Sequence, residues 1–306
     1  MTATPAAISP PKAPRIRTER TGWGTVLLFL GPALVLLLIF LVYPVISTLR
    51  MSVDRGLGGN FTRFVGLDNY ITLLQTPSFV GSIFNNVLWI VFYTGFVILF
   101  GLIIAVIAMR VRYEATIKAI VFLPMAIAAT ALGVIWTFVY ALDPRIGTLN
   151  ALLGIVHLGP VSWLGDPTFV NASLIAVGIW GSTGFATVIL SAALKGIPTE
   201  ILEAARTDGA NEIQIFARII VPMVSLPISV LAVTLIVNVI KLFDIPYVMT
   251  QGGPGYASRV IAFEMYKQDF AAGQYGKAAA VAVVMLIILI PVMVFNVRRF
   301  RSSAVV

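Results

Sequence analysis

Hydrophobic residues along this chain collect into six long runs that contain no Asp, Glu, Lys or Arg, and polar stretches separate the runs. A helix that crosses a bilayer needs about 20 apolar residues, and one charge near its centre costs about 2.5–3.5 kcal/mol. The pattern therefore predicts an all-α integral membrane protein with six transmembrane helices. The expected helices cover residues 23–49, 86–109, 119–140, 170–194, 224–240 and 278–297.

The amino-acid composition agrees with a membrane protein. Of 306 residues, 59% are hydrophobic and 11% are charged, whereas a soluble domain has about 25% charged residues. The net charge is +8, but no basic stripe is dense enough to indicate nucleic-acid binding. There is no cysteine and only one histidine, His157. This excludes disulfides, cysteine metal sites and a histidine cluster, and no metal or cofactor site is expected in this chain.

The distribution of Lys and Arg predicts the orientation, because the cytoplasmic loops of membrane proteins are enriched in both residues. With the N-terminus inside, the inner segments hold most of the 21 basic residues, including Arg298, Arg299 and Arg301 after the last run. Both termini are therefore expected to be cytoplasmic. Residues 1–22 are expected to form a disordered basic tail and residues 23–300 a transmembrane domain.

One polar stretch, EILEAARTDGANEIQIFARIIVPM at residues 200–223, lies between the fourth and fifth runs on the predicted inner side. Pro198 and Glu200 are typical of a helix start. The Asp208-Gly209 pair breaks that helix, and Asn211, with Gln214 three residues later, predicts a second helix start. The residues alone allow two interpretations, an ordinary solvated loop or a docking element for a soluble partner.

The spacing of this stretch resembles the EAA signature of binding-protein-dependent ABC importer permeases of the MetI-like type. That signature has Glu-Ala-Ala, three residues, Gly, nine residues, Ile, one residue and Leu-Pro. Here Val221 replaces the leucine, and the matching positions are Glu203, Ala204, Ala205, Gly209, Ile219 and Pro222. Segments 64–70, 179–185 and 243–255 also resemble the carbohydrate-type members, so that the resemblance covers roughly residues 25–300.

The resemblance implies that residues 198–221 form a cytoplasmic coupling hairpin that docks on a separate ATPase, and that the chain itself is not an enzyme. No P-loop occurs in the sequence, so ATP and Mg would be bound by the partner. The implied partners are two ATPase subunits, a second and often different permease subunit, an extracytoplasmic substrate-binding protein and the lipid of a bacterial inner or plasma membrane. The implied coupling residues are Glu203, Ala204, Ala205, Arg206, Asp208, Gly209, Phe216, Ile219 and Pro222.

A carbohydrate is the substrate class that the resemblance implies, either an oligosaccharide or a disaccharide, with glycerol phosphate left open. Sugar sites combine aromatic faces with hydrogen-bonding groups, and polar side chains within spans face the interior of a helix bundle. The same side chains also serve as glue between helices. The candidate pathway residues are Asn86, Tyr93, Trp180, Thr183, Asn238, Lys241 and Asp244.

Two other function classes fit the sequence less well. An ion-coupled secondary transporter usually places an acid within a span, and the six runs contain none. An intramembrane enzyme would need a catalytic histidine, paired acids or a serine with a base inside the membrane, and the runs do not provide them. The sequence therefore favours the permease subunit of an ATP-driven importer.

Overall fold

The computed structural model describes residues 23–57, 60–109 and 111–303, and the chain divides into two compact units, residues 1–47 and 48–306. Within the described residues, four helices are long and apolar enough to cross a membrane. Two further pairs of helices would each make one bent span, which would raise the number to six. The tail predicted at residues 1–22 lies outside the described residues.

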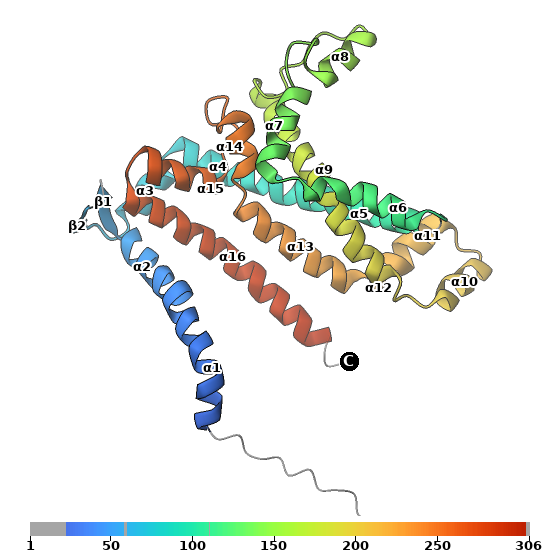
Figure 1. Ribbon diagram of the computed structural model, residues 1–306, viewed down its shortest axis with the longest axis horizontal. Helices are drawn as coiled ribbons and strands as arrows, with labels where there is room; N and C mark the ends of the chain where they lie inside the picture. Colours follow the sequence, from blue (N-terminus) through green and yellow to red (C-terminus); the bar gives the residue numbers. More distant parts are fainter. Residues whose placement is uncertain (1–22, 58–59, 110, 304–306) are drawn as a thin grey trace, which may run out of the picture. The chain divides into compact units, whose positions relative to one another are not determined.

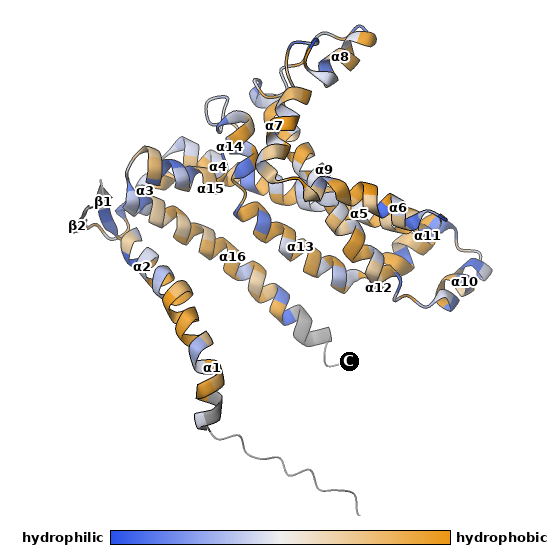
Figure 2. Cartoon of the chain, viewed as in Figure 1, coloured by the Kyte–Doolittle hydropathy of each residue, from blue (hydrophilic) through white to orange (hydrophobic). Residues whose placement is uncertain are grey.

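An apolar helical rod begins in the first unit, and its last helix extends beyond residue 47. It consists of α1 (Trp23–Leu37), a π-helical segment η1 (Leu38–Val42) and α2 (Tyr43–Ser52). Hydrophobic colours dominate α1 in Figure 2. Most of the rod's large apolar side chains are exposed, as expected of a helix that has lipid or another membrane helix as its surroundings.

The second unit is organised around two long helical segments that pack along each other (Figure 1). The first is continuous from α4 (Pro77–Leu88) through the π-helical η2 (Trp89–Tyr93) to α5 (Thr94–Ala108), and the second is α9 (Pro167–Leu194). A Cβ atom added to Gly101 would lie 2.6 Å from the Cβ of Ala186. One added to Gly184 would lie 2.3 Å from the carbonyl oxygen of Val121. Small residues therefore allow close helix packing here.

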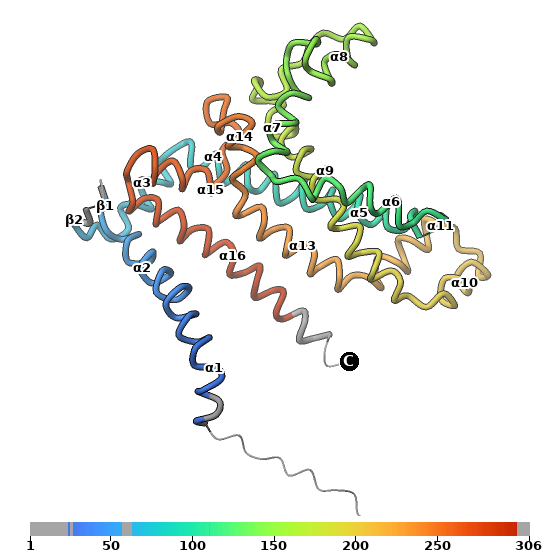
Figure 3. Tube along the Cα trace, in the orientation of Figure 1, coloured from blue at the N-terminus to red at the C-terminus, as the bar shows by residue number. Residues whose placement is uncertain are grey.

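One predicted span is bent in the structure, and a second bend lies just before another span (Figure 3). The run at 119–140 divides into α6 (Glu114–Phe122), the 3₁₀ segment η3 (Leu123–Ala126) and α7 (Ala129–Val139), with a 97° bend. Pro124 lies in η3 and has no N–H to donate, and Ile127 and Ala128 adopt extended conformations that end the helix.

The second bend, of 71°, precedes the run at 224–240. There the chain passes from α11 (Glu212–Ile215) through the π-helical η4 (Phe216–Ile220) and α12 (Val221–Met223) into α13 (Ser225–Ile240). Val224 lies between the two helices with a non-helical backbone.

The remaining elements are short, apart from the last helix, α16. They include a two-stranded antiparallel hairpin in the segment after the first predicted span, so that the fold is mostly but not entirely helical. A Cβ atom at Gly276 would lie 2.1 Å from the carbonyl oxygen of Asp54, which shows how closely α16 packs on this hairpin. The elements are β1 (Asp54–Leu57), β2 (Asn60–Phe64), α3 (Asp68–Leu74), α8 (Thr148–Ile155), α10 (Thr199–Thr207), α14 (Asp244–Thr250), α15 (Ile261–Tyr266), η5 (Lys267–Ala271) and α16 (Tyr275–Ser303).

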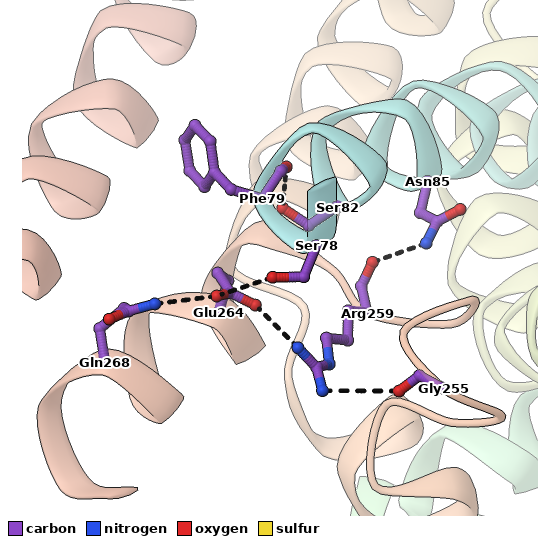
Figure 4. A network of polar contacts seen from close by, with 8 residues as sticks. All are labelled: Ser78, Phe79, Ser82, Asn85, Gly255, Arg259, Glu264 and Gln268. Carbon is purple, nitrogen blue, oxygen red and sulfur yellow. Dashed lines mark hydrogen bonds and ion pairs between the residues drawn. The ribbon is translucent and has the colours of Figure 1, made fainter. Parts of the chain in front are cut away.

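A buried acid that the sequence did not indicate fixes the segment between α13 and α16 (Figure 4). The side chain of Glu264 is 1% exposed and lies 3.5 Å from Nη1 of Arg259. Its Oε1 accepts hydrogen bonds from Ser78 at 3.3 Å and Gln268 at 3.0 Å. The amide of Asn85 donates to the Arg259 carbonyl at 2.7 Å. This network joins α4 to α15 and to η5.

We expect Glu264→Ala to destabilise the protein strongly, because it would leave the largely buried guanidinium of Arg259 without its carboxylate partner. Breaking a buried pair in this way costs about 3–5 kcal/mol. The midpoint of thermal unfolding of the purified protein would measure the effect. Asp143→Ala is the matched control, because it removes an acid from the exposed Asp143–Arg145 pair and should change the midpoint little. Equal midpoints for both variants would contradict this account of the network.

Candidate functional site

The charged stretch folds as a helical hairpin whose turn is set by local chemistry. α10 ends at Asp208, and Gly209 follows with φ of +82°, a left-handed conformation that favours glycine. The amide of Ala210 donates to the carbonyl of Ala205 at 3.0 Å, which closes the end of the helix. The capping box predicted for the second helix is present, with reciprocal 2.9 Å hydrogen bonds between Asn211 and Gln214.

The tip of the hairpin presents charged and apolar side chains to the outside. Nε of Arg206 lies 3.1 Å from the carboxylate of Glu212 and links α10 to α11. Glu203 is exposed, and within the described part of the chain no hydrogen bond or ion pair involves its carboxylate. Ile213 is 79% exposed, which is unusual for an isoleucine outside a membrane span.

The base of the hairpin is anchored in the core of the second unit. Ile215 and Ile220 are buried in the same hydrophobic cluster as residues of α5 and α9, and Ala205 and Phe216 pack against that cluster. A small cavity of about 160 Å³ remains beneath the hairpin, where Leu202 and Arg206 of α10 meet the ends of α5 and α9. The hairpin therefore lies against the ends of these two long helices.

The residues predicted from the signature divide into two groups in the structure. Ala205 and Phe216 are partly buried and belong to the base, and Ile219, next to the buried Ile220, is also partly buried. The members of the other group are exposed on the hairpin: Glu203, Ala204, Arg206, Asp208, Gly209 and Pro222.

A central cavity of about 210 Å³ lies where η2, η3, α9 and α13 meet. Its polar lining consists of Trp89, Tyr93, Ser182 and Asn238, and the Tyr93 hydroxyl hydrogen-bonds to Ser182 Oγ at 2.8 Å. The buried indole N–H of Trp89 has no hydrogen-bond partner among the described residues. None of the described residues that line this cavity is charged. The cavity can therefore hydrogen-bond a neutral polar molecule.

Of the seven pathway residues predicted from the sequence, Tyr93 and Asn238 line this cavity. Asn86 instead connects elements, because its amide donates to the Val239 carbonyl at 3.1 Å and its oxygen accepts from the Ile261 N–H at 2.8 Å. The hydroxyl of Thr183 donates to the Ile179 carbonyl of its own helix at 2.7 Å.

The other three predicted residues also lie away from the cavity lining. The ring of Trp180 meets the edge of Trp136, with 5.6 Å between ring centroids. Lys241 and Asp244 are exposed, beyond the end of α13. Trp89 and Gly178 also line the cavity. The π-helical turn that brings Trp89 and Tyr93 to the same cavity has no recognisable sequence signal.

Comparison with known proteins identifies relatives of this chain. A family model described as "Binding-protein-dependent transport system inner membrane component" matches residues 97–300. The osmoprotective compounds uptake permease protein GgtC of Synechocystis sp. is 44% identical, over 90% of this chain and 99% of its own length. The alpha-glucoside transport system permease protein AglF of Rhizobium meliloti is 42% identical, over 89% of this chain and 81% of its own.

Among solved structures, a similar chain belongs to a bacterial ABC transporter involved in the import of the acidic polysaccharide alginate. The TM-score is 0.75 at 25% sequence identity, and the match covers 90% of this chain and 96% of that one. The similarity therefore extends over nearly the whole of both chains.

Proposed function

Because this chain belongs to the binding-protein-dependent transport system inner membrane components, which are permease subunits of ABC importers, we propose that its hairpin couples a partner ATPase to a pathway for a neutral carbohydrate. The observation that carries the proposal is the continuity of one element. The hairpin leads through η4 and α12 into α13, and the far end of α13 supplies Asn238 and Val239 to the central cavity.

The two ends of this continuous element have different chemistry. At the hairpin, an exposed Glu203 and an exposed Ile213 offer a charge and an apolar anchor to a soluble protein. The base is buried around Ile215 and Ile220, so that a force on the tip moves the spans rather than a loose loop. Binding and hydrolysis of ATP by the partner would supply that force, and this chain would supply the lever.

At the cavity, the lining favours an uncharged solute. Ser182 and Asn238 provide hydrogen-bonding groups, and Trp89 and Tyr93 provide aromatic surface, which is the combination that suits a sugar. A phosphate group would need a cationic partner, and none of the described lining residues is cationic. The lining therefore supports a carbohydrate over glycerol phosphate. The names of the two relatives, an alpha-glucoside permease and an osmoprotectant permease, leave saccharides and small neutral osmolytes as the compounds to test.

The remaining partners follow from the family. A single chain would form half of the translocation path, with a second permease subunit forming the other half and a substrate-binding protein delivering the solute from outside. Two ATPase subunits would bind ATP and Mg on the cytoplasmic side, where both termini of this chain are also proposed to lie.

We expect Glu203→Lys to reduce ATP-driven uptake by about tenfold or more, because a reversed charge at a docking site disrupts its pairing. The assay would combine uptake of labelled solute into proteoliposomes with recovery of the ATPase on the purified permease. Asp143→Lys makes the same type of change at an exposed acid far along the chain from the hairpin and should leave both measurements near wild type. Normal uptake and normal ATPase recovery with Glu203→Lys would contradict the coupling role.

We expect Gly181→Leu to block uptake without loss of the ATPase, because the new side chain would grow into the central cavity. A Cβ atom at Gly181 would already lie 3.6 Å from Leu132 across the cavity lining. Gly95→Leu is the matched control, since a Cβ atom there would meet nothing within 4 Å. If both variants transported at the wild-type rate while remaining bound to the ATPase, the cavity would not be the path of the solute.

A further inference from the structure

Five aromatic rings gather between α13 and α16, and none of the five lines the central cavity, although Leu242 and Ile245 of the same segment do. Phe243 directly precedes α14, and Tyr247 lies within α14. The other three rings belong to α15 and η5. The centroids of Phe243 and Tyr247 are 4.8 Å apart in a stacked pair, and those of Tyr266 and Phe270 are 5.0 Å apart in a second stacked pair. We call Phe243, Tyr247, Phe263, Tyr266 and Phe270 the aromatic ladder.

The two stacked pairs are joined into one continuous ladder. Phe243 and Tyr266 are 5.0 Å apart, and Tyr247 meets Tyr266 edge to face at 5.5 Å. Phe263 is buried behind them. The phenol groups of Tyr247 and Tyr266 also interact, and their hydrogen bond raises the pKa of Tyr266. The five rings therefore form one packed cluster, and two of them, Tyr247 and Tyr266, carry hydroxyl groups.

The ends of the ladder are open to the surroundings. Phe270 is 74% exposed and Tyr247 is 38% exposed. Exposed rings of this size are rare in a segment that lies outside the apolar spans. Lys241 and Asp244 are exposed on either side of Phe243 in the sequence. Asp244 precedes Tyr247 by three residues in α14, so that this carboxylate lies on the same side of the helix as that ring.

The network around Glu264 holds the part of the ladder that comes from α15 and η5. Glu264 lies next to Phe263 in α15. Its carboxylate accepts a hydrogen bond from Gln268 of η5, which lies two residues from both Tyr266 and Phe270 in the sequence. The same carboxylate also contacts Ser78 of α4 and Arg259 of the loop before α15. The open rings are therefore presented by a rigid support rather than by a loose loop, which lowers the entropy cost of binding.

We propose that the aromatic ladder is a second carbohydrate contact, outside the central cavity, on which a sugar stacks as it passes between the binding protein and the cavity. A pyranose ring has a face of C–H groups that packs on an aromatic ring and hydroxyl groups at its edge that hydrogen-bond to polar neighbours. Tyr247 and Phe270 supply the faces, and the phenol groups, Lys241 and Asp244 supply the polar neighbours. The inference rests on the proposed function, since it assumes that the solute is a carbohydrate.

Uptake by the complete transporter in proteoliposomes tests the proposal, with saturating binding protein and radiolabelled trehalose, an α-glucoside, as the probe. Tyr247→Leu and Phe270→Leu remove a flat ring but keep an apolar side chain, and each should lower the uptake rate by about two- to tenfold. Tyr247→Phe keeps the ring and should retain most of the rate. Tyr256→Leu is the matched control, because Tyr256 is an exposed aromatic residue in the preceding loop that is not part of the ladder.

The outcomes separate the possible failures. Wild-type uptake rates for both leucine variants would overturn the proposal. If these variants also unfolded at a lower temperature in the bilayer while uptake stayed unchanged, the rings would have a membrane-anchoring role instead. Should Tyr247→Leu fail to fold, Phe270→Leu decides the matter, because that ring is mostly exposed and its loss disturbs little packing. If the wild-type transporter itself carries no saccharide, the proposed substrate class fails first, independently of the ladder.

Discussion

The exclusion of charge from hydrocarbon organises this protein. A bilayer accepts an ionised side chain only at a high free-energy cost, and it provides no partner for an open backbone amide. The chain therefore places its acids and bases at the ends of helices and between them. Two of its charged networks, Arg206–Glu212 in the hairpin and Arg259–Glu264 before α16, both lie outside the predicted spans. What remains inside is neutral, and the central cavity has the same character.

Because of this separation, the hairpin and the central cavity have different chemical properties. The hairpin has charge, an exposed isoleucine and a buried base, which are the properties of a surface that meets a protein and transmits force. The central cavity has amide, hydroxyl and aromatic groups without charge, which suit a neutral polyol. α13 connects the two, and the 71° bend at Val224 separates the end of the hairpin from α13.

Much of the fold could be predicted from the sequence because apolar runs and helix-end signals act locally. The six runs correspond to the four long helices and two bent pairs, and the capping box at Asn211 and Gln214 forms as expected. The bends were not predicted, since hydropathy measures how apolar a run is and not its direction; Pro124 was the available signal for one of them. The short strands after α2 also had too weak a pattern to stand out.

The sites were harder to predict, because they depend on contacts between distant segments. Asn86 has the residue type and depth of a pathway residue, yet the fold uses both ends of its amide to join Val239 and Ile261. Glu264 lies in an outer segment, where the sequence gave no sign that an acid would be buried. The hairpin was easier, since its turn, its caps and its motif lie within one continuous stretch.

The central claim, that the hairpin tip meets the ATPase, can be tested directly because the natural chain has no cysteine. A single cysteine at Glu203 should form a cross-link to an ATPase subunit with a short bifunctional reagent, and the yield should change when ATP is added. A cysteine at Asp143 should give no such product. If the cysteine at position 203 reacted instead with a membrane-impermeant reagent added from outside intact cells, the hairpin would face the wrong side and the account would be contradicted.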